Sequence, residues 1–285
     1  MIYILLLFQA LIASGTHIIA KIVVKDIDPV TLTFTRSVMA AIGLLMLSAL
    51  RRTKLNFKRE DFSKIMFLSF LAIPVNQFLF LTAIKYTTAS NAALLYGTTP
   101  AVVLVLSTFM RLEKAGWKKI SGVAIAFTGI VIVVFEKGIN FKSEYTVGNL
   151  LLVVAVLAWA LYTVKGKPMI LKYGAFKTSA ATMIFGTIMY IPVGIYNALS
   201  FDYGSMTVQH WGGLIYLAFG TSIFAYLLWY YALSRIETTK VAVFANVQPV
   251  LTTILSVLFL GQVITPAFII GGSIALTGVV IAQLG

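Results

Sequence analysis

The chain reads AIKYTTASNAALLYGTTPAVVLVLSTFMRLE over Ala83–Glu113 and ALSRIETTKVAVFANVQPVLTTILSVLFLGQ over Ala232–Gln262. A shift of 149 residues (83 to 232) superposes the two stretches without a gap and places Pro100 on Pro249. Each copy has the pattern of an apolar helix with a proline in mid-span, followed by a short turn and a glycine-containing apolar helix. The second half of the chain therefore repeats the first, and internal repeats of apolar helices are typical of membrane transporters.

Apolar spans account for nearly all of the chain. It is 285 residues long, 60% hydrophobic and only 11% charged, with a mean hydropathy of +0.96, whereas soluble domains are roughly 45–50% apolar. A transmembrane helix takes about 20 mostly apolar residues. Ten stretches meet this requirement: Ile2–Val24, Pro29–Leu50, Phe62–Ala83, Ser90–Met110, Trp117–Phe135, Gly148–Val164, Phe176–Ala198, Trp211–Leu233, Thr238–Leu260 and Thr265–Leu284.

These patterns predict an all-α integral membrane protein. We expect ten transmembrane helices in two five-helix repeats, over residues 1–140 and 141–285. Because each repeat contains an odd number of spans, the second is inserted upside down relative to the first. The first span lacks the basic region of a signal peptide and is expected to be retained. The absence of cysteine excludes disulfides, Cys-ligated metals and thiol catalysis.

The net charge of +13 is concentrated in alternate connectors. One set of connectors and adjoining helix ends carries Arg51, Arg52, Lys54, Lys58, Arg59 and Lys64, then Arg111, Lys114, Lys118 and Lys119, then Lys165, Lys167, Lys172 and Lys177, and finally Arg235 and Lys240. The other set carries only Lys25, Lys85, Lys137 and Lys142. Short cytoplasmic loops collect Lys and Arg, so we expect a multi-pass protein of the inner membrane with both termini in the cytoplasm. The basic surface is expected to contact anionic lipid headgroups, not nucleic acid.

With these features the chain resembles the EamA family of the drug/metabolite transporter superfamily. The resemblance rests on the two quoted stretches, on the helices with Gly122/Gly129 and Gly271/Gly278, and on PVTLTFTRSVMA from Pro29, which is similar to that family's second helix. It implies ten helices in two inverted repeats and export of amino acids or related metabolites.

No acidic residue lies in the middle of a span. Mid-membrane carboxylates are the usual proton relays and the usual partners of cationic drugs, so their absence argues against a cation antiporter and weakens the case for proton coupling. It also argues against intramembrane hydrolysis, because no paired acids and no His-Glu-x-x-His motif are present. We expect neither an enzyme nor a cofactor or metal site.

Two ionisable side chains, His17 and Arg36, lie about 10 Å below the predicted outer edge, at 1.5 Å per helical residue. One interpretation is that Arg36 anchors a carboxylate or another anionic group of a solute. The alternative is structural: Arg36 hydrogen-bonds backbone carbonyls between helices, or extends outwards to the interface. The same two interpretations apply to His17.

The two prolines mark a second candidate region. Each removes a backbone donor and frees the carbonyl four residues earlier, at Tyr96 and Ala245. Such groups are tolerated where they line a cavity or pack against protein. The flanking side chains Tyr96, Thr99, Asn246 and Gln248 are therefore expected to line a pathway, or else to bond across helices.

Other spans add amides, aromatic rings and small residues. Asn76 and Gln77 are expected to face inward, while Trp159, Tyr162 and Trp229 could form an aromatic wall or serve packing. Gly122 and Ala126, repeated at Gly271 and Ala275, have the spacing of close helix packing. The candidate substrate-binding residues are His17, Arg36, Asn76, Gln77, Tyr96, Thr99, Trp159, Tyr162, Trp229, Asn246 and Gln248.

The sequence thus predicts a secondary transporter that moves small polar metabolites by alternating access, as a monomer or weak dimer among membrane lipids, and the resemblance implies export of amino acids or related metabolites. Two alternatives stay open. One is a carrier of a bulkier solute, such as a nucleotide-sugar or a lipid precursor, and the other is a non-transporting membrane scaffold.

Overall fold

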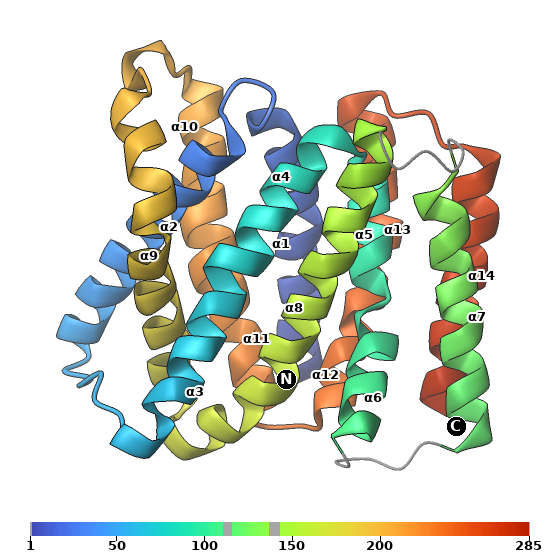
Figure 1. The fold of residues 1–285 in the computed structure, drawn as a ribbon, viewed down its shortest axis with the longest axis horizontal. Helices are drawn as coiled ribbons and strands as arrows, with labels where there is room; N and C mark the ends of the chain where they lie inside the picture. The colour runs from blue at the N-terminus through green and yellow to red at the C-terminus, as the bar shows by residue number, and fades with distance from the viewer. Residues whose placement is uncertain (1, 111–115, 137–142, 285) are drawn as a thin grey trace.

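The computed structural model describes residues 2–110, 116–136 and 143–284, and within these ranges the regular elements are all helical. Arg111, Glu113, Lys114, Lys137 and Lys142 of the sequence pattern lie outside the described residues. The described helices run up and down a bundle (Figure 1), and several of its crossings consist of two or three consecutive helices.

The first half holds α1 (Ile2–Val23), α2 (Pro29–Leu50), α3 (Arg59–Phe70), η1 (Leu71–Gln77), α4 (Phe78–Tyr86), α5 (Ala89–Gly97), α6 (Thr99–Phe109) and α7 (Trp117–Val134). The second half holds α8 (Glu144–Tyr173), α9 (Ala175–Ser200), η2 (Tyr203–Ser205), α10 (Val208–Ile215), η3 (Tyr216–Ala225), α11 (Tyr226–Leu233), α12 (Thr238–Ala242), η4 (Val243–Asn246), α13 (Val247–Leu260) and α14 (Pro266–Leu284).

The predicted ten-helix fold is confirmed. Nine helical runs in the described ranges are long and apolar enough to cross a membrane, and α14 supplies a shorter apolar stretch, Pro266–Ala282. The largest difference in bounds concerns α8, which was expected over Gly148–Val164 but extends from Glu144 to Tyr173. Pro168 lies inside this helix without ending it, so the basic residues after Val164 stand on additional helical turns beyond the apolar stretch.

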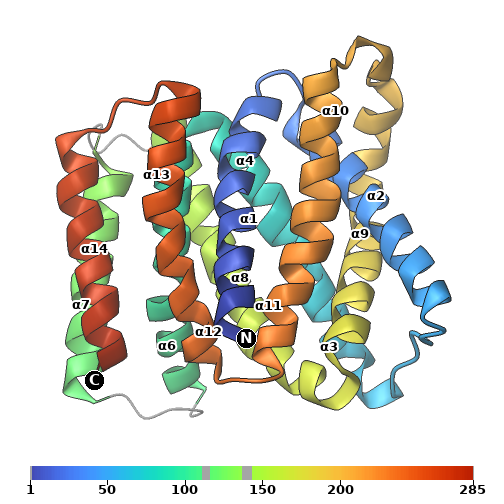
Figure 2. The same ribbon diagram turned by 180° about the vertical axis from the view of Figure 1, so that it is seen from behind.

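The crossings alternate in direction, so the first crossing of each half, α1 and α8, run opposite ways (Figure 1). The beginning of α1 and the end of α14 lie at one edge of the molecule, together with the α2–α3, α8–α9 and α11–α12 connections (Figures 1 and 2). We call this the basic edge, because these connections and the adjoining helix ends carry most of the described Lys and Arg residues. That it faces the cytoplasm stays a prediction.

Local chemistry accounts for several helix ends. Asp28 caps α2 by accepting hydrogen bonds from the backbone nitrogens of Val30 and Thr31, at 2.9 and 3.3 Å, and Pro29 occupies the first turn, where its missing donor costs nothing. At the other end of a helix, Gly261 ends α13 with a φ of 59°, a left-handed conformation that glycine adopts without steric cost.

α7 and α14 form a close antiparallel pair at one side of the bundle (Figure 2). A Cβ atom on Gly129 would collide with the backbone nitrogen of Ala275, and one on Gly122 would collide with that of Ala282. The prediction that these small residues serve close packing is therefore confirmed, and the pair contributes nothing to the polar centre described next.

Candidate functional site

A cavity with many polar side chains in its wall lies inside the bundle, and residues from both halves line it. Its volume is about 80 Å³, room for several water molecules at roughly 10–15 Å³ each. Helices α1, α2, α4, α5, α8, α11 and α13 and the segments η1 and η3 surround it. Its wall consists of Gln9, Ala13, Thr16, His17, Arg36, Asn76, Gln77, Phe80, Tyr96, Trp159, Thr221, Ala225, Tyr226 and Gln248.

The structure brings together seven of the predicted site residues in this wall, namely His17, Arg36, Asn76, Gln77, Tyr96, Trp159 and Gln248. It places Thr99, Tyr162, Trp229 and Asn246 outside the cavity lining. That any of these residues contacts a solute stays a prediction.

Arg36 is the only cation in the cavity wall, and it is 1% exposed. Within the described residues its one hydrogen bond runs from a terminal guanidinium nitrogen to Ser222 Oγ, at 2.9 Å, and its Nε has no partner. The cavity lining contains no carboxylate. The predicted structural role, in which Arg36 bonds backbone carbonyls, does not match this geometry.

His17 connects α1 to α13 across the cavity. Its Nε2 lies 3.3 Å from Gln248 Oε1, while its Nδ1 has no hydrogen-bond partner among the described residues. The ring packs edge-on against Phe80, with centroids 5.3 Å apart, and lies 5.6 Å from the ring of Tyr96. These contacts hold the imidazole in place and leave one of its nitrogens unpaired.

The amides of Asn76 and Gln77 behave differently. Asn76 Nδ2 donates to the hydroxyl of Tyr96 at 2.7 Å and to the carbonyl of Ala155 at 2.8 Å, and its Oδ1 accepts a hydrogen bond from Tyr226 at 3.3 Å. Gln77 Oε1, by contrast, has no partner. Asn76 is thus fixed by both halves, whereas Gln77 keeps an unpaired acceptor next to the cavity.

Both halves widen into a π-helical segment beside the cavity. The first, η1, follows Phe70 and contains Pro74, Asn76 and Gln77, and the second, η3, supplies Thr221 and Ala225 to the wall. π-helical turns are rare and are frequently found at functional sites. Neither segment was predicted from the sequence, in which Pro74 is a local sign of an irregular helix at the first.

Several wall residues were also missed, among them Gln9, Thr16 and Thr221. Gln9 is the one amide in an apolar stretch of α1, and such a residue has to face a polar partner or a cavity. That signal was present in the sequence. Thr16 and Thr221 share a hydrogen bond of 2.7 Å between their hydroxyls, and this contact between α1 and η3 has no signature in either segment alone.

An aromatic cluster extends from the cavity along α8 and α11 toward the basic edge. Trp159 and Tyr226 line the cavity with ring centroids 5.0 Å apart. The predicted site residues Tyr162 and Trp229 pack behind them: Tyr162 stacks on Tyr230 at 4.9 Å, and Trp229 Nε1 donates to Thr163 Oγ1 at 3.1 Å. The second aromatic layer therefore closes this side of the cavity.

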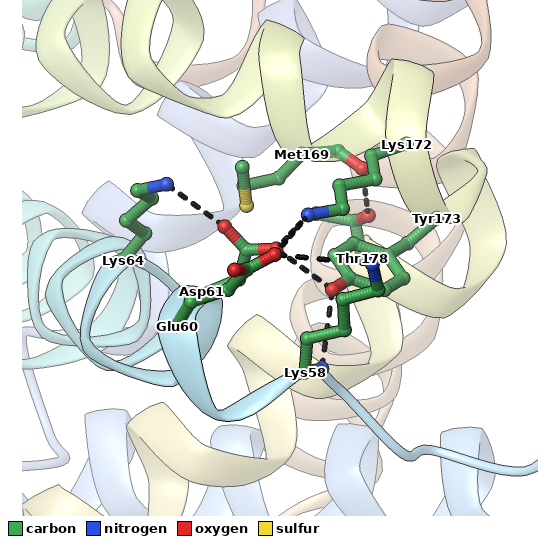
Figure 3. Close-up of polar contacts among 8 residues, drawn as sticks. All are labelled: Lys58, Glu60, Asp61, Lys64, Met169, Lys172, Tyr173 and Thr178. Atoms are coloured by element: carbon green, nitrogen blue, oxygen red, sulfur yellow. Dashed lines mark hydrogen bonds and ion pairs between the residues drawn. The ribbon is translucent and has the colours of Figure 1, made fainter.

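A charged cluster on the basic edge joins the start of α3 to the end of α8 (Figure 3). The buried Asp61 carboxylate accepts hydrogen bonds from Lys64 and from the Tyr173 hydroxyl, both at 2.8 Å, and pairs with Lys172. Lys172 also pairs with Glu60 at 3.0 Å. The cluster ties the two halves together on the same side as the aromatic layer. No three His, Cys, Asp or Glu side chains in the described part of the chain gather as a metal site requires.

Comparisons with known proteins agree with this architecture. The model of the EamA-like transporter family matches residues 1–135 and 146–283. An uncharacterized transporter of Archaeoglobus fulgidus is 36% identical over 97% of this chain and 95% of its own length. A probable terminal-alkyne amino-acid exporter of Streptantibioticus cattleyicolor is 22% identical over 68% of this chain and 63% of its own. A solved crystal structure with 18% identity has the same fold, with a TM-score of 0.71 over 98% of this chain and 96% of that one.

Proposed function

The chain belongs to the EamA-like transporter family, and from this premise we propose that it is a secondary carrier of small, carboxylate-bearing polar metabolites. The observation that carries the proposal is the Arg36 guanidinium, buried in a cavity whose lining holds no carboxylate. A cation at membrane depth costs at least about 2.5–3.5 kcal/mol. The carboxylate of a bound solute would offset that cost, because guanidinium and carboxylate groups form strong two-pronged hydrogen bonds.

Unpaired atoms around the cavity support the same assignment. Gln9 Oε1, Gln77 Oε1 and His17 Nδ1 have no hydrogen-bond partner among the described residues. Buried polar groups are normally satisfied, so small side-chain shifts on binding would let these atoms serve a polar solute. Amide oxygens accept hydrogen bonds from an amino group, which favours amino acids over simple carboxylates.

Cavity size favours a small solute. At about 80 Å³ the cavity lies well below the roughly 300–1,000 Å³ typical of pockets for drug-sized ligands. The alternative of a nucleotide-sugar or lipid precursor would require a much larger opening of the bundle. The name of the Streptantibioticus cattleyicolor relative, a probable amino-acid exporter, is the reason to propose export across the cytoplasmic membrane.

The mechanism we propose is alternating access between the repeats, residues 1–140 and 141–285. A cavity between two parts that rock against each other can open to one side of the membrane at a time. Opening toward the basic edge would break the Asp61–Lys172 contact, which joins α3 of the first repeat to α8 of the second. Solute binding at Arg36 would hold both repeats through α2 and η3, because Ser222 belongs to η3.

The test compares Arg36→Gln and Arg36→Lys with the wild type in proteoliposomes loaded with a radiolabelled amino-acid mixture. Removing one partner of a buried charge pair costs about 2–5 kcal/mol, so Arg36→Gln should reduce kcat/KM about thirtyfold or more without a lower thermal unfolding temperature. The kcat/KM of Arg36→Lys should lie between those of the wild type and Arg36→Gln, because lysine keeps the positive charge but lacks the planar, two-pronged guanidinium group. Lys85→Gln, an exposed cation outside the cavity, is the control.

Other outcomes would contradict the proposal in distinct ways. A folded Arg36→Gln protein with unchanged flux would remove Arg36 from solute binding. Loss of thermal stability in step with flux would make Arg36 a structural residue. No wild-type flux of any solute offered, in a correctly folded preparation, would favour the membrane scaffold.

A further inference from the structure

The basic edge contains a groove that is separate from the central cavity. It has a volume of about 430 Å³, and its wall is formed by the start of α1, the end of α8 and the connection between α11 and α12. Figure 2 shows the start of α1 and the α11–α12 connection near the N-terminus. No residue of the central cavity wall belongs to the groove. Its wall consists of Tyr3, Lys167, Leu171, Leu233, Ser234, Arg235, Ile236, Glu237 and Lys240.

The groove has an excess of positive charge, with three cations and a single carboxylate in its wall. Lys167 Nζ donates to the backbone carbonyl of Ile236 at 2.8 Å, which fixes the ammonium group at the groove. Lys240 pairs with Glu237 at 3.2 Å. Arg235 lies over the ring of Tyr231, 5.2 Å from its centroid, and has no carboxylate partner among the described residues.

One rim of the groove is apolar and exposed. Tyr3 is 53% exposed and Leu171 is 62% exposed, and Tyr3 is held by stacking on Phe244, with centroids 5.8 Å apart. Exposed apolar side chains of a membrane protein are suited to contact acyl chains, whereas Arg235 and Lys240 lie at the turn between α11 and α12, where a span ends and lipid headgroups are expected. The groove therefore opens both to the lipid and to the aqueous edge.

We propose that this groove binds a phosphate-bearing anion, supplied by the headgroup of an anionic phospholipid. Cationic pockets between transmembrane helices at a membrane surface are suited to such headgroups. The apolar rim favours a lipid over free phosphate, because it offers contacts to an acyl chain that a soluble ion cannot use. The α11–α12 connection joins two crossings that line the central cavity. A bound headgroup would therefore stabilise the packing of these two crossings against each other.

The experiment titrates the full-length purified protein, in neutral detergent micelles, with phosphatidylglycerol, phosphatidylcholine or inorganic phosphate. Bound lipid is counted by native mass spectrometry, and thermal unfolding is followed in parallel. Each surface cation contributes about 1 kcal/mol, so the double variant Arg235→Gln/Lys240→Gln should bind phosphatidylglycerol roughly thirtyfold more weakly. The control Lys54→Gln/Arg59→Gln removes the same charge from the α2–α3 connection and should change binding less than about threefold.

A variant that is expected to strengthen lipid binding serves as a control, because a loss of folding could not produce that result. Glu237→Gln removes the one carboxylate of the groove and should tighten phosphatidylglycerol binding about fivefold, while Glu60→Gln on the same edge should not. Equal losses in both double variants would show diffuse surface attraction and overturn the proposal, as would unchanged binding in the groove variant. A different outcome is that inorganic phosphate raises the unfolding temperature of the wild type and not that of the Arg235→Gln/Lys240→Gln variant. That result would keep the anion site and overturn the lipid as its occupant.

Discussion

The α5–α6 and α12–α13 crossings are two copies of one sequence pattern, yet they contribute to the cavity at different positions. Tyr96 lines the cavity in the first copy, and its counterpart 149 residues on is Ala245 (96 to 245), which does not. In the second copy Gln248 lines the cavity, and its counterpart Thr99 does not. Each crossing provides one polar side chain, but from non-equivalent positions.

Side-chain length explains the difference between Thr99 and Gln248. The Thr99 hydroxyl turns back and donates to the Tyr96 carbonyl at 2.5 Å, the carbonyl that Pro100 leaves without its helical donor. A short hydroxyl next to a free carbonyl satisfies the backbone of its own helix. The longer amide of Gln248 reaches across to His17. The repeat thus preserves the backbone break, while the side chain decides whether a polar atom reaches the cavity.

Gly97 and Asn246 occupy equivalent positions of the two copies but differ in size and in their contacts. Gly97 lies directly against Pro249 of the other copy, so close that a Cβ atom there would stand 2.5 Å from the Pro249 Cγ. Asn246 occupies the equivalent place and carries an Oδ1 without a partner. In the first copy, the missing side chain of Gly97 allows the two proline-containing helices to approach closely. In the second copy, the equivalent position carries the larger side chain of Asn246.

The largest expected effect follows from enlarging Gly97. Gly97→Val should lower the free energy of unfolding by about 3 kcal/mol, because the new atoms overlap the Pro249 ring and force α5 and α13 apart. Thermal unfolding in detergent would measure it. Gly212→Val is the matched control, since a Cβ at Gly212 meets nothing within 4 Å. Equal stability of the two variants would show that the close approach of the proline helices does not matter.

Truncation of Gln248 should have the next largest effect, on transport. Gln248→Ala removes a hydrogen-bonding group from the cavity wall and should raise the apparent KM about tenfold to a hundredfold, or 1–3 kcal/mol. Thr99→Ala, at the equivalent position, should change KM by less than about threefold and act on stability instead. Flux measurements on both variants test the comparison directly, and equal increases in KM would break it.

The smallest effect is expected for Asn246→Ala. Because its Oδ1 makes no hydrogen bond within the described residues, the substitution removes no hydrogen bond from that atom and should change the free energy of unfolding by less than about 0.5 kcal/mol. The apparent KM for the transported solute should stay within about twofold, well below the tenfold that one polar contact is worth. A tenfold increase in KM would instead return Asn246 to the pathway, as the sequence pattern predicted.

Much of the fold was predictable because the bilayer imposes it. An apolar run such as Pro29–Leu50 or Thr238–Leu260 has to form helical structure that satisfies its own backbone. The structure has these outer bounds, as one helix in α2 and as consecutive helices from α12 to α13. The same reasoning located Arg36 and His17, since ionisable groups in an apolar helix have to turn toward a polar interior. Gln9 was open to this argument as well.

The remainder of the site depended on contacts between segments distant in the sequence. Trp229 and Tyr162 have the same composition signal as Trp159, but only the packing of α8 on α11 puts Trp159 in the cavity wall and the other two behind it. The sequence by itself determined the ten spans, the repeat and the family, because hydrophobicity and chain periodicity are local properties. The tertiary structure alone decided which polar atoms meet in the cavity, since a side chain's partner is set by the helix packed against it and by its own reach.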